Sequence, residues 1–253
     1  MTVRGRRIAL YLGVPLGILL VLVLSAALWY FLKMTSEIGK MSAIDSQEVV
    51  SGIYAIKDES YINFYIVKSS SSLIAIDSGQ NQNNVKNELT KLNLDPLKVA
   101  AVFLTHTDPD HVGTLGLFPN AKVYLSQEEE QIINGRTPRW LIISNQLPAH
   151  YELLSDNQIV EVADCRVRCI LTPGHTPGSM SYVVNDRYLF TGDTLSLKNT
   201  KVAVFNEFFN MDTDKQKNSI AKLSKLPDVQ YIFTAHYGHS ANYQNSFADW
   251  TGK

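Results

Sequence analysis

Cysteine is scarce in this sequence, and so is net charge. The 253 residues include two cysteines, Cys165 and Cys169, which lie four positions apart in one expected strand. Four residues of extended chain span roughly 13 Å, which is too far for a disulfide bond between them. The 23 Lys and Arg residues nearly balance the 24 Asp and Glu residues and leave a formal net charge of −1. This balance gives no electrostatic support for nucleic-acid binding, so no nucleic-acid partner is expected.

Charged residues are missing altogether from residues 8–32. As an α-helix this run would be about 37 Å long at about 1.5 Å per residue, which is enough to span a bilayer. Arg4, Arg6 and Arg7 precede the run, and clustered basic residues favour a cytoplasmic N-terminus. We therefore expect a cytoplasmic segment over 1–7, a single transmembrane anchor over 8–32 and the rest of the chain outside the cytoplasm.

A cleaved signal peptide is the alternative interpretation of this run. Residues 25–27, Ser-Ala-Ala, offer small side chains at the spacing of a cleavage site. Residues 28–32 continue the apolar run past that point, and Trp29 and Tyr30 suit a membrane interface. The membrane is therefore the expected partner of an uncleaved helix, and secretion after cleavage is the alternative.

The remaining chain has the pattern of an α/β domain. Residues 33–47 are polar and are expected to form a tether, and residues 48–253 are long enough for one domain with its own core. Apolar and β-branched segments predict strands near 49–57, 61–67, 73–76, 99–104, 123–125, 158–162, 166–171, 180–184, 187–191 and 230–233, with helices near 82–93 and 214–225. Strands that alternate with helices in two halves fit an αβ/βα sandwich.

Four metal-binding side chains occur within residues 106–111, which read His-Thr-Asp-Pro-Asp-His. They follow the apolar run 99–104, so they lie just past the end of a buried strand. In extended chain, positions i and i+2 point the same way, so His106 and Asp108 can bind one ion. Pro109 favours extended geometry at the residue before it, and a turn after it can direct the last two side chains at a second ion. The alternative is a polar loop that caps a helix.

Three further turns carry a possible ligand directly after an apolar strand. They hold His175 after residues 168–171, Asp193 after residues 187–190 and His236 after residues 230–233. A buried histidine or a helix-capping aspartate would explain any one of them alone. Their recurrence favours a metal centre, and imidazole with carboxylate suits zinc, iron or manganese. His239 is a candidate for a group behind the ligands or in contact with substrate, although a surface histidine is the simpler interpretation.

These positions resemble the metallo-β-lactamase-fold hydrolase superfamily over roughly residues 48–240. The family pattern is a His-x-His-x-Asp-His loop followed by a separate His, a bridging Asp and a final His. Residues 74–79, Ile-Ala-Ile-Asp-Ser-Gly, also resemble the family's early strand that ends in Asp-x-Gly. The resemblance implies a four-layer αβ/βα sandwich, here preceded by one transmembrane helix, with the metal loops along one edge.

The resemblance also implies a role for each candidate. His106, Asp108 and His175 would hold metal 1, Asp110, His111 and His236 would hold metal 2, and Asp193 would bridge them. Two adjacent cations lower the pKa of a shared water and polarise a carbonyl or phosphoryl oxygen. Asp110 is the catalytic candidate, because it can orient that water or carry its proton to the leaving group.

Asp108 departs from the family pattern, which usually has histidine there. Flavodiiron-type relatives carry a glutamate at this place and hold iron. A carboxylate favours iron or manganese but remains compatible with zinc, so two divalent ions are expected, zinc foremost. No segment resembles a flavodoxin domain, and 17 residues follow His236.

The expected function is that of a membrane-anchored binuclear hydrolase acting on an ester, thioester, lactone or similar small molecule. A diiron oxidoreductase or oxygen-binding protein, and a non-catalytic metal-binding domain, are the alternatives. Cleavage of β-lactams is less expected, because lactamases generally lack a bridging aspartate such as Asp193. Residues 135–143 could form a lid, touch the membrane or simply connect the two halves. Residues 204–211 could wall the site or pack in the core.

Overall fold

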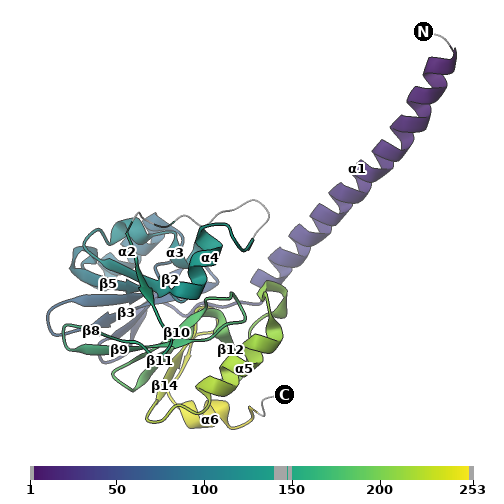
Figure 1. The fold of residues 1–253 in the computed structure, drawn as a ribbon. Coiled ribbons are helices and arrows are strands. Elements are labelled where there is room, and N and C mark those ends of the chain that lie inside the picture. Colours follow the sequence, from purple (N-terminus) through teal and green to yellow (C-terminus); the bar gives the residue numbers. More distant parts are fainter. Residues whose placement is uncertain (1–2, 140–146, 148–149, 251–253) are drawn as a thin grey trace. The chain divides into compact units, whose positions relative to one another are not determined.

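The computed structural model describes residues 3–139, 147 and 150–250. The chain divides into two compact units, Met1–Lys40 and Met41–Lys253 (Figure 1). The first unit consists of helix α1, Val3–Ile38. Within Gly17–Ile38, an apolar window of 18 residues has a mean hydropathy of 2.0 and contains no buried residue. This helix is long and apolar enough to cross a membrane, and a signal sequence would have the same properties.

The second unit contains a sheet of seven strands in the order β1-β2-β3-β4-β5-β6-β7. The strands are β1 Gln47–Val50, β2 Ile53–Asp58, β3 Ile62–Lys68, β4 Leu73–Ile76, β5 Val99–Phe103, β6 Lys122–Ser126 and β7 Glu152–Leu154. Pairing is antiparallel from β1 to β4 and parallel from β4 to β7.

A second sheet has six strands in the order β15-β14-β11-β10-β9-β8. The strands are β8 Ile159–Val162, β9 Cys165–Leu171, β10 Met180–Val184, β11 Tyr188–Phe190, β14 Tyr231–Phe233 and β15 His239–Ser240. Strands β12, Leu195–Lys198, and β13, Lys201–Val204, pair as a separate hairpin.

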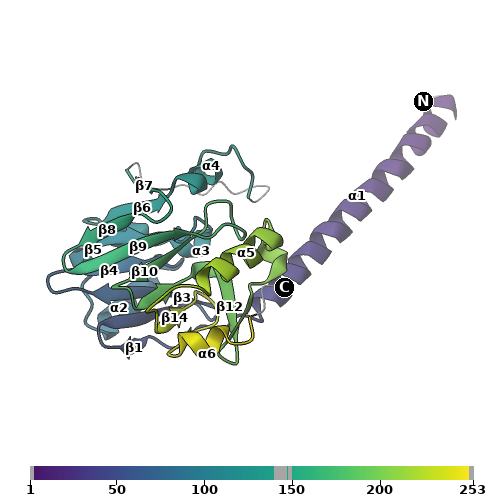
Figure 2. The ribbon, with the colours of Figure 1, turned by 60° about the horizontal axis from the view of Figure 1, so that its bottom comes forward.

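The helices cover the outer faces of the two sheets. They are α2 Gln82–Lys91, α3 Pro109–Val112, α4 Glu130–Ile133, α5 Thr213–Leu223 and α6 Tyr243–Phe247. Short 3-10 turns lie at Pro96–Lys98, Leu115–Leu117, Gln127–Glu129, Gly192–Thr194 and Glu207–Phe209. Figure 1 shows α2, α3 and α4 on the side of the first sheet, and Figure 2 shows α5 and α6 together on the side of the second.

Three apolar clusters hold these layers together. The central one packs side chains of both sheets face to face, including Phe103 and Phe233. The second packs α2 against the first sheet, and the third packs α5 and α6 against the second sheet. Burial of apolar surface between layers is the dominant stabilising contribution in such a fold. The predicted four-layer αβ/βα sandwich is therefore confirmed.

Most predicted strands and helices are confirmed, and the elements that were not predicted are short. The expected strand over 49–57 is wrong, because a turn at Gly52, with φ of +80°, divides it into β1 and β2. Strands β7, β12, β13 and β15 and helix α6 were not predicted. Each has five residues or fewer, too few to show a clear period in the sequence.

The topology brings several strand ends to a common edge. Strands β4 and β5 are parallel, and so are β11 and β14. Strand β9 points the same way as β11, because both are antiparallel to β10. The loops that carry the predicted ligands follow β5, β9, β11 and β14 at their carboxyl ends.

Candidate metal centre

The structure brings all seven predicted ligands together. Three groups have ligand atoms within 4.8 Å of one another: His106, Asp108 and His175; His106, His111 and Asp193; and Asp110, His111 and His236. All seven are buried except Asp110, whose side chain is 22 % exposed. The residues come from four loops far apart in the sequence, so the fold and not local sequence assembles this centre.

Pro109 shapes the first of these loops as predicted. Asp108 is extended, with φ of −64° and ψ of 150°, and Pro109 begins α3. His106 and Asp108 consequently point the same way, with His106 Nε2 3.5 Å from Asp108 Oδ2. The turn of α3 then places His111 within 4.0 Å of Asp110 Oδ1 through its Nε2 atom.

The two oxygens of Asp193 face two different pairs of histidines. Oδ2 is 3.4 Å from His175 Nε2 and 4.0 Å from His106 Nε2. Oδ1 is 3.2 Å from His236 Nε2 and 3.7 Å from His111 Nε2. One carboxylate therefore lies between two sets of nitrogen donors, as a bridging ligand does.

Several of these atoms lack a conventional partner. Among the residues that the structure describes, His106 Nε2, His111 Nε2 and Asp193 Oδ1 are buried without a hydrogen bond. A buried polar atom without a partner is costly, so such atoms are normally satisfied. Nitrogen and carboxylate donors that converge in this way fit a divalent ion.

The other nitrogen of each histidine is held by an oxygen. His111 Nδ1 pairs with Asp77 Oδ2 at 2.9 Å, His236 Nδ1 with the Tyr61 carbonyl at 2.7 Å, His175 Nδ1 with Asn210 Oδ1 at 3.3 Å, and His106 Nδ1 with Thr105 Oγ1 at 3.1 Å. When Nδ1–H donates to an oxygen, the Nε2 lone pair is left for a metal. All four rings are thus oriented with Nε2 toward the centre.

Two buried acids support the loops from behind. Asp77, at the predicted Asp-x-Gly, accepts from the Thr105 amide at 2.7 Å and from the Thr105 hydroxyl at 2.8 Å, in addition to its contact with His111. Glu129 accepts from the amide and the hydroxyl of Thr107, both at 2.8 Å, and from the Thr176 hydroxyl at 2.6 Å. Glu129 therefore ties the loop after β5 to the loop after β9.

Gly178 explains why Glu129 can approach so closely. A Cβ at Gly178 would lie 2.1 Å from the Glu129 amide nitrogen. Burial raises the pKa of Glu129, and its three hydrogen bonds come from threonine groups. The sequence analysis did not identify Glu129, which is one of three consecutive glutamates at residues 128–130.

Arg139 is the residue that sequence reasoning missed most clearly. Its Nε donates to Asp108 Oδ1 at 2.9 Å, and its Nη2 lies 2.6 Å from Asp108 Oδ2 and 2.9 Å from His175 Nε2. Its Nη1 donates to the Phe209 carbonyl at 2.8 Å. Of the 135–143 segment, residues 140–143 lie outside the described residues, and residue 139 reaches the metal centre. The extra negative charge of Asp108 was the available signal, because a buried carboxylate requires a partner.

The comparisons with known proteins place the chain in a family. The model of the metallo-beta-lactamase superfamily matches residues 58–236, which is more than half of the chain. The chain belongs to the metallo-beta-lactamase superfamily. The resemblance recognised from the ligand pattern is thus confirmed.

The chain is also similar to proteins whose names state an activity. It is 32% identical over 136 residues to the "Probable polyketide biosynthesis zinc-dependent hydrolase PksB" of Bacillus subtilis, covering 52% of this chain and 54% of that protein. It is 28% identical to the hydroxyacylglutathione hydrolase of Glaesserella parasuis, covering 74% of this chain and 69% of that protein. The match thus spans about half the length of PksB.

Solved structures of the superfamily share the fold. A metallo-beta-lactamase family protein of Thermus thermophilus superposes with a TM-score of 0.64 at 20% identity, covering 80% of this chain and 79% of that chain. A subclass B3 metallo-beta-lactamase of Bradyrhizobium japonicum superposes with a TM-score of 0.61 at 17% identity, covering 78% of this chain and 79% of that chain. At these identities the likeness shows the fold alone.

The surroundings keep two carboxylates of this superfamily centre ionised. Burial opposes ionisation of Asp193, but the charges of three nearby histidines, His236 foremost, outweigh it and hold its pKa below the usual range. Burial also opposes ionisation of Asp108, yet its contacts with His106, His175 and the Arg139 guanidinium hold its pKa well below its usual range. Both side chains are therefore negative at neutral pH, as ligands of a cation must be.

Zinc affinity is expected to fall as the pH is lowered. Burial lowers the pKa of His111, but Asp77, Asp110 and Asp193 together raise it to about 10. Despite burial, Asp193 also raises the pKa of His236. A pKa of about 10 means that the metal-free protein holds the His111 ring protonated at neutral pH, so an ion must displace that proton in order to bind. Below the pKa, affinity should drop by about tenfold per pH unit for each proton displaced.

Competition with a chromophoric zinc chelator at a series of pH values between about 8 and 6 measures this dependence. The variant His150→Gln is the matched control, because His150 is exposed and does not belong to the metal groups of the described residues. It should follow the same curve as the parent protein. A zinc affinity independent of pH over this range would contradict the proton competition.

Aromatic side chains line the centre. The Phe205 ring lies 5.1 Å from the His175 ring and 5.7 Å from the His236 ring, so the 204–211 segment does wall the site. The Tyr61 ring stacks on the His236 ring at 5.9 Å. His239 packs against the Phe233 ring, 6.0 Å away, and is in none of the metal groups found among the described residues. Because Asp110 is the most exposed ligand, substrate would approach from its side.

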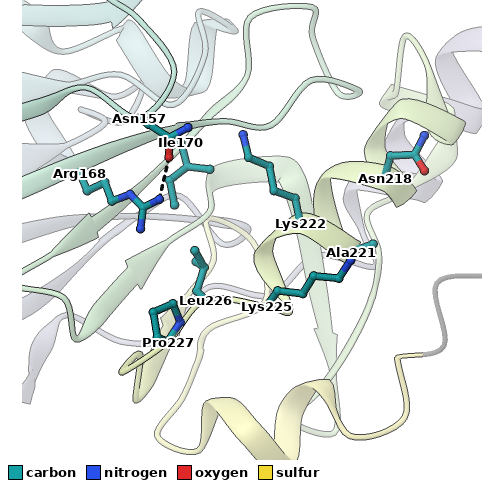
Figure 3. Close-up of a pocket in the computed structure, with 9 residues that line it drawn as sticks. All are labelled: Asn157, Arg168, Ile170, Asn218, Ala221, Lys222, Lys225, Leu226 and Pro227. Carbon is teal, nitrogen blue, oxygen red and sulfur yellow. Dashed lines mark hydrogen bonds between the residues drawn. The ribbon is translucent and has the colours of Figure 1, made fainter.

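A groove of about 540 Å³ lies elsewhere, between β9 and α5 (Figure 3). It is lined in part by Arg168, Lys222 and Lys225 and contains none of the metal ligands. Arg168 donates to Asn157 at 2.7 Å, and Lys222 pairs with Asp156 at 2.9 Å. The chemistry of the centre therefore does not use this groove.

Proposed function

We propose that this chain is a membrane-anchored, metal-dependent hydrolase with a two-ion centre. The observation that carries the proposal is Asp193, whose two oxygens face separate histidine pairs. In the proposed assignment, His106, Asp108 and His175 hold metal 1, and Asp110, His111 and His236 hold metal 2. Divalent ions bound there would supply an activated water and would polarise a substrate oxygen.

The relatives and the walls of the site support the proposed substrate class. Relatives named as a hydroxyacylglutathione hydrolase and as a zinc-dependent hydrolase support cleavage of a thioester, ester, lactone or similar small molecule. The rings of Phe205 and Tyr61 flank the histidines and would exclude bulk water from part of the centre. An apolar wall beside a charged centre suits a small molecule with both apolar and carbonyl groups.

Asp110 has the position of a proton carrier. Its side chain is the most exposed of the seven ligands, and its Oδ2 lies 3.6 Å from His236 Nε2. A carboxylate that reaches both the centre and solvent can accept a proton from the attacking water and pass it to a leaving group. Zinc is the ion expected first, and iron or manganese remains compatible with Asp108.

A substrate panel tests the proposed function. The zinc-loaded full-length chain in detergent should hydrolyse at least one member of a set of chromogenic thioesters, esters, lactones, phosphoesters and β-lactams. A chelator should abolish turnover and added zinc should restore it. The variant Asp110→Asn should lower kcat by about 10²- to 10⁴-fold, the contribution typical of general acid–base catalysis. A zinc-loaded protein that cleaves no member of the panel would refute the hydrolase assignment.

Deletion of residues 1–34 is expected to release a soluble protein that still binds zinc. The deleted part lies within the first compact unit, and the seven proposed ligands lie in the second, Met41–Lys253. The full-length chain should stay in the membrane fraction, which fractionation followed by metal analysis of both proteins would establish. Full-length protein found in the soluble fraction with its N-terminus at Leu28 would instead show a cleaved signal.

A further inference from the structure

The guanidinium of Arg139 lies among the donor atoms proposed for metal 1. Its Nη2 is 2.6 Å from Asp108 Oδ2 and 2.9 Å from His175 Nε2. The side chain is 4 % exposed, and the Phe209 carbonyl accepts a further hydrogen bond from it. Arg139 is therefore fixed on several sides at once, directly against two of the three residues of this group.

A metal ion and Arg139 would both use the lone pair of His175 Nε2. His175 Nδ1 points to Asn210 Oδ1, so Nδ1 carries the proton and Nε2 offers its one lone pair. That lone pair accepts from Arg139 in the structure. A bound ion would require it too, at about 2.0–2.1 Å for zinc. An ion can therefore bind His175 only after Arg139 withdraws from it.

The metal 2 group meets no such competitor. Within the described part of the chain, His111 Nε2 and Asp193 Oδ1 have no hydrogen-bond partner. His236 Nε2 faces Asp193 at 3.2 Å and Asp110 at 3.6 Å, which are both carboxylates. An ion that binds these donors displaces a proton, as described above, but no neighbouring cationic side chain.

The charges around the two metal groups also favour tighter binding of the ion at the metal 2 group. Asp108, Asp110 and Asp193 bring three negative charges to the centre. One divalent ion together with the Arg139 guanidinium supplies three positive charges and balances them. Asp77 and Glu129 add negative charge from behind the ligands, where Asp77 pairs with His111 and Glu129 accepts hydrogen bonds from Thr107 and Thr176. A second ion adds positive charge next to the guanidinium, which like-charge repulsion opposes.

We propose that Arg139 competes with the metal for the metal 1 donors, so that the two ions bind with unequal affinity. The first ion binds Asp110, His111 and His236, and the second binds only when it displaces the guanidinium from His175 and Asp108. Asp108 and Arg139 thus act as a matched pair in place of the neutral histidine usual in the family. This inference rests on the two-ion centre proposed above.

Zinc titration of the full-length chain in detergent, against chromophoric chelators of graded affinity, tests the competition. In Arg139→Met the dissociation constant of the second zinc should fall by about 10- to 100-fold, because a competing set of charge-assisted hydrogen bonds is removed. The control is Arg136→Met, since Arg136 is 69 % exposed and pairs only loosely with Glu130 at 3.7 Å. This control should leave both dissociation constants unchanged.

A second variant covers the case in which Arg139→Met does not fold. Asp108→His removes the carboxylate that anchors the guanidinium, and it should likewise tighten the second zinc and narrow the gap between the two dissociation constants. Two equally tight ions in the parent protein, or an unchanged second constant in every folded variant, would overturn the competition while leaving the two-ion centre intact. A parent protein that binds no zinc at all would instead refute the proposed centre itself.

Discussion

Replacing Asp193 with alanine should reduce kcat by at least about 10³-fold, equivalent to roughly 4 kcal/mol of lost transition-state stabilisation, and should lower bound zinc to one ion or fewer. The side chain faces all four histidines of the centre through its two oxygens. Without this carboxylate, the repulsion between two cations is no longer offset and their separation is no longer fixed. A terminal ligand such as His236 contributes to one ion, so its loss should leave the other ion in place.

Metal analysis and steady-state kinetics on Asp193→Ala, His236→Ala and a surface control measure this difference. Asp214→Ala is a suitable control, because the Asp214 side chain is 92 % exposed and lies 3.5 Å from Lys217, and exposed pairs contribute little to stability. Circular dichroism would establish that each variant is folded. Two zinc ions and undiminished turnover in folded Asp193→Ala would show that Asp193 does not bridge the ions.

Substitution of Asp77 should lower both the stability of the protein and its affinity for zinc. Asp77 does not itself belong to the metal groups of the described residues. The variant Asp77→Ala removes the acceptor for His111 Nδ1 and for the amide and hydroxyl of Thr105. Buried donors left without a partner cost about 1–3 kcal/mol each, so the loss of all three partners should lower the free energy of unfolding by roughly 3–9 kcal/mol. Loss of a group that orients a ligand should also weaken zinc binding by about 10- to 100-fold.

Thermal unfolding of the zinc-free protein and chelator competition separate the two consequences of this substitution. Asp77→Asn retains an acceptor for one of the three donors and should recover part of the stability, but the neutral amide should support His111 less well than a carboxylate. A loss of stability with unchanged zinc affinity would mean that Asp77 serves the fold alone.

The metal ligands could be predicted from the sequence because each of the four loops that carry them follows its own strand. His106, His175 and His236 come directly after apolar segments that the sequence pattern predicts to be strands. A parallel or alternating arrangement of those strands then brings their ends to one edge. Local chemistry also predicted the extended backbone at Asp108, since proline restricts the residue before it.

The groups behind the ligands could not be predicted in the same way. Arg139 lies 31 residues from Asp108 and 36 from His175 along the chain, and it meets them only in the folded state. Glu129 sits in an acidic run whose other members face solvent or lie partly exposed. Such contacts depend on how loops cross between layers, and no spacing in the sequence encodes that crossing. The short strands β12 and β13 were missed because four residues show too little alternation.

Zinc stoichiometry at saturation tests the central claim most directly. The full-length chain, stripped of metal and titrated with zinc in detergent until binding is complete, should take up two ions per chain, and hydrolysis of the substrate found in the panel should appear as they bind. A protein that binds no zinc at saturation, or only one ion with full turnover, would contradict the two-ion centre assembled around Asp193.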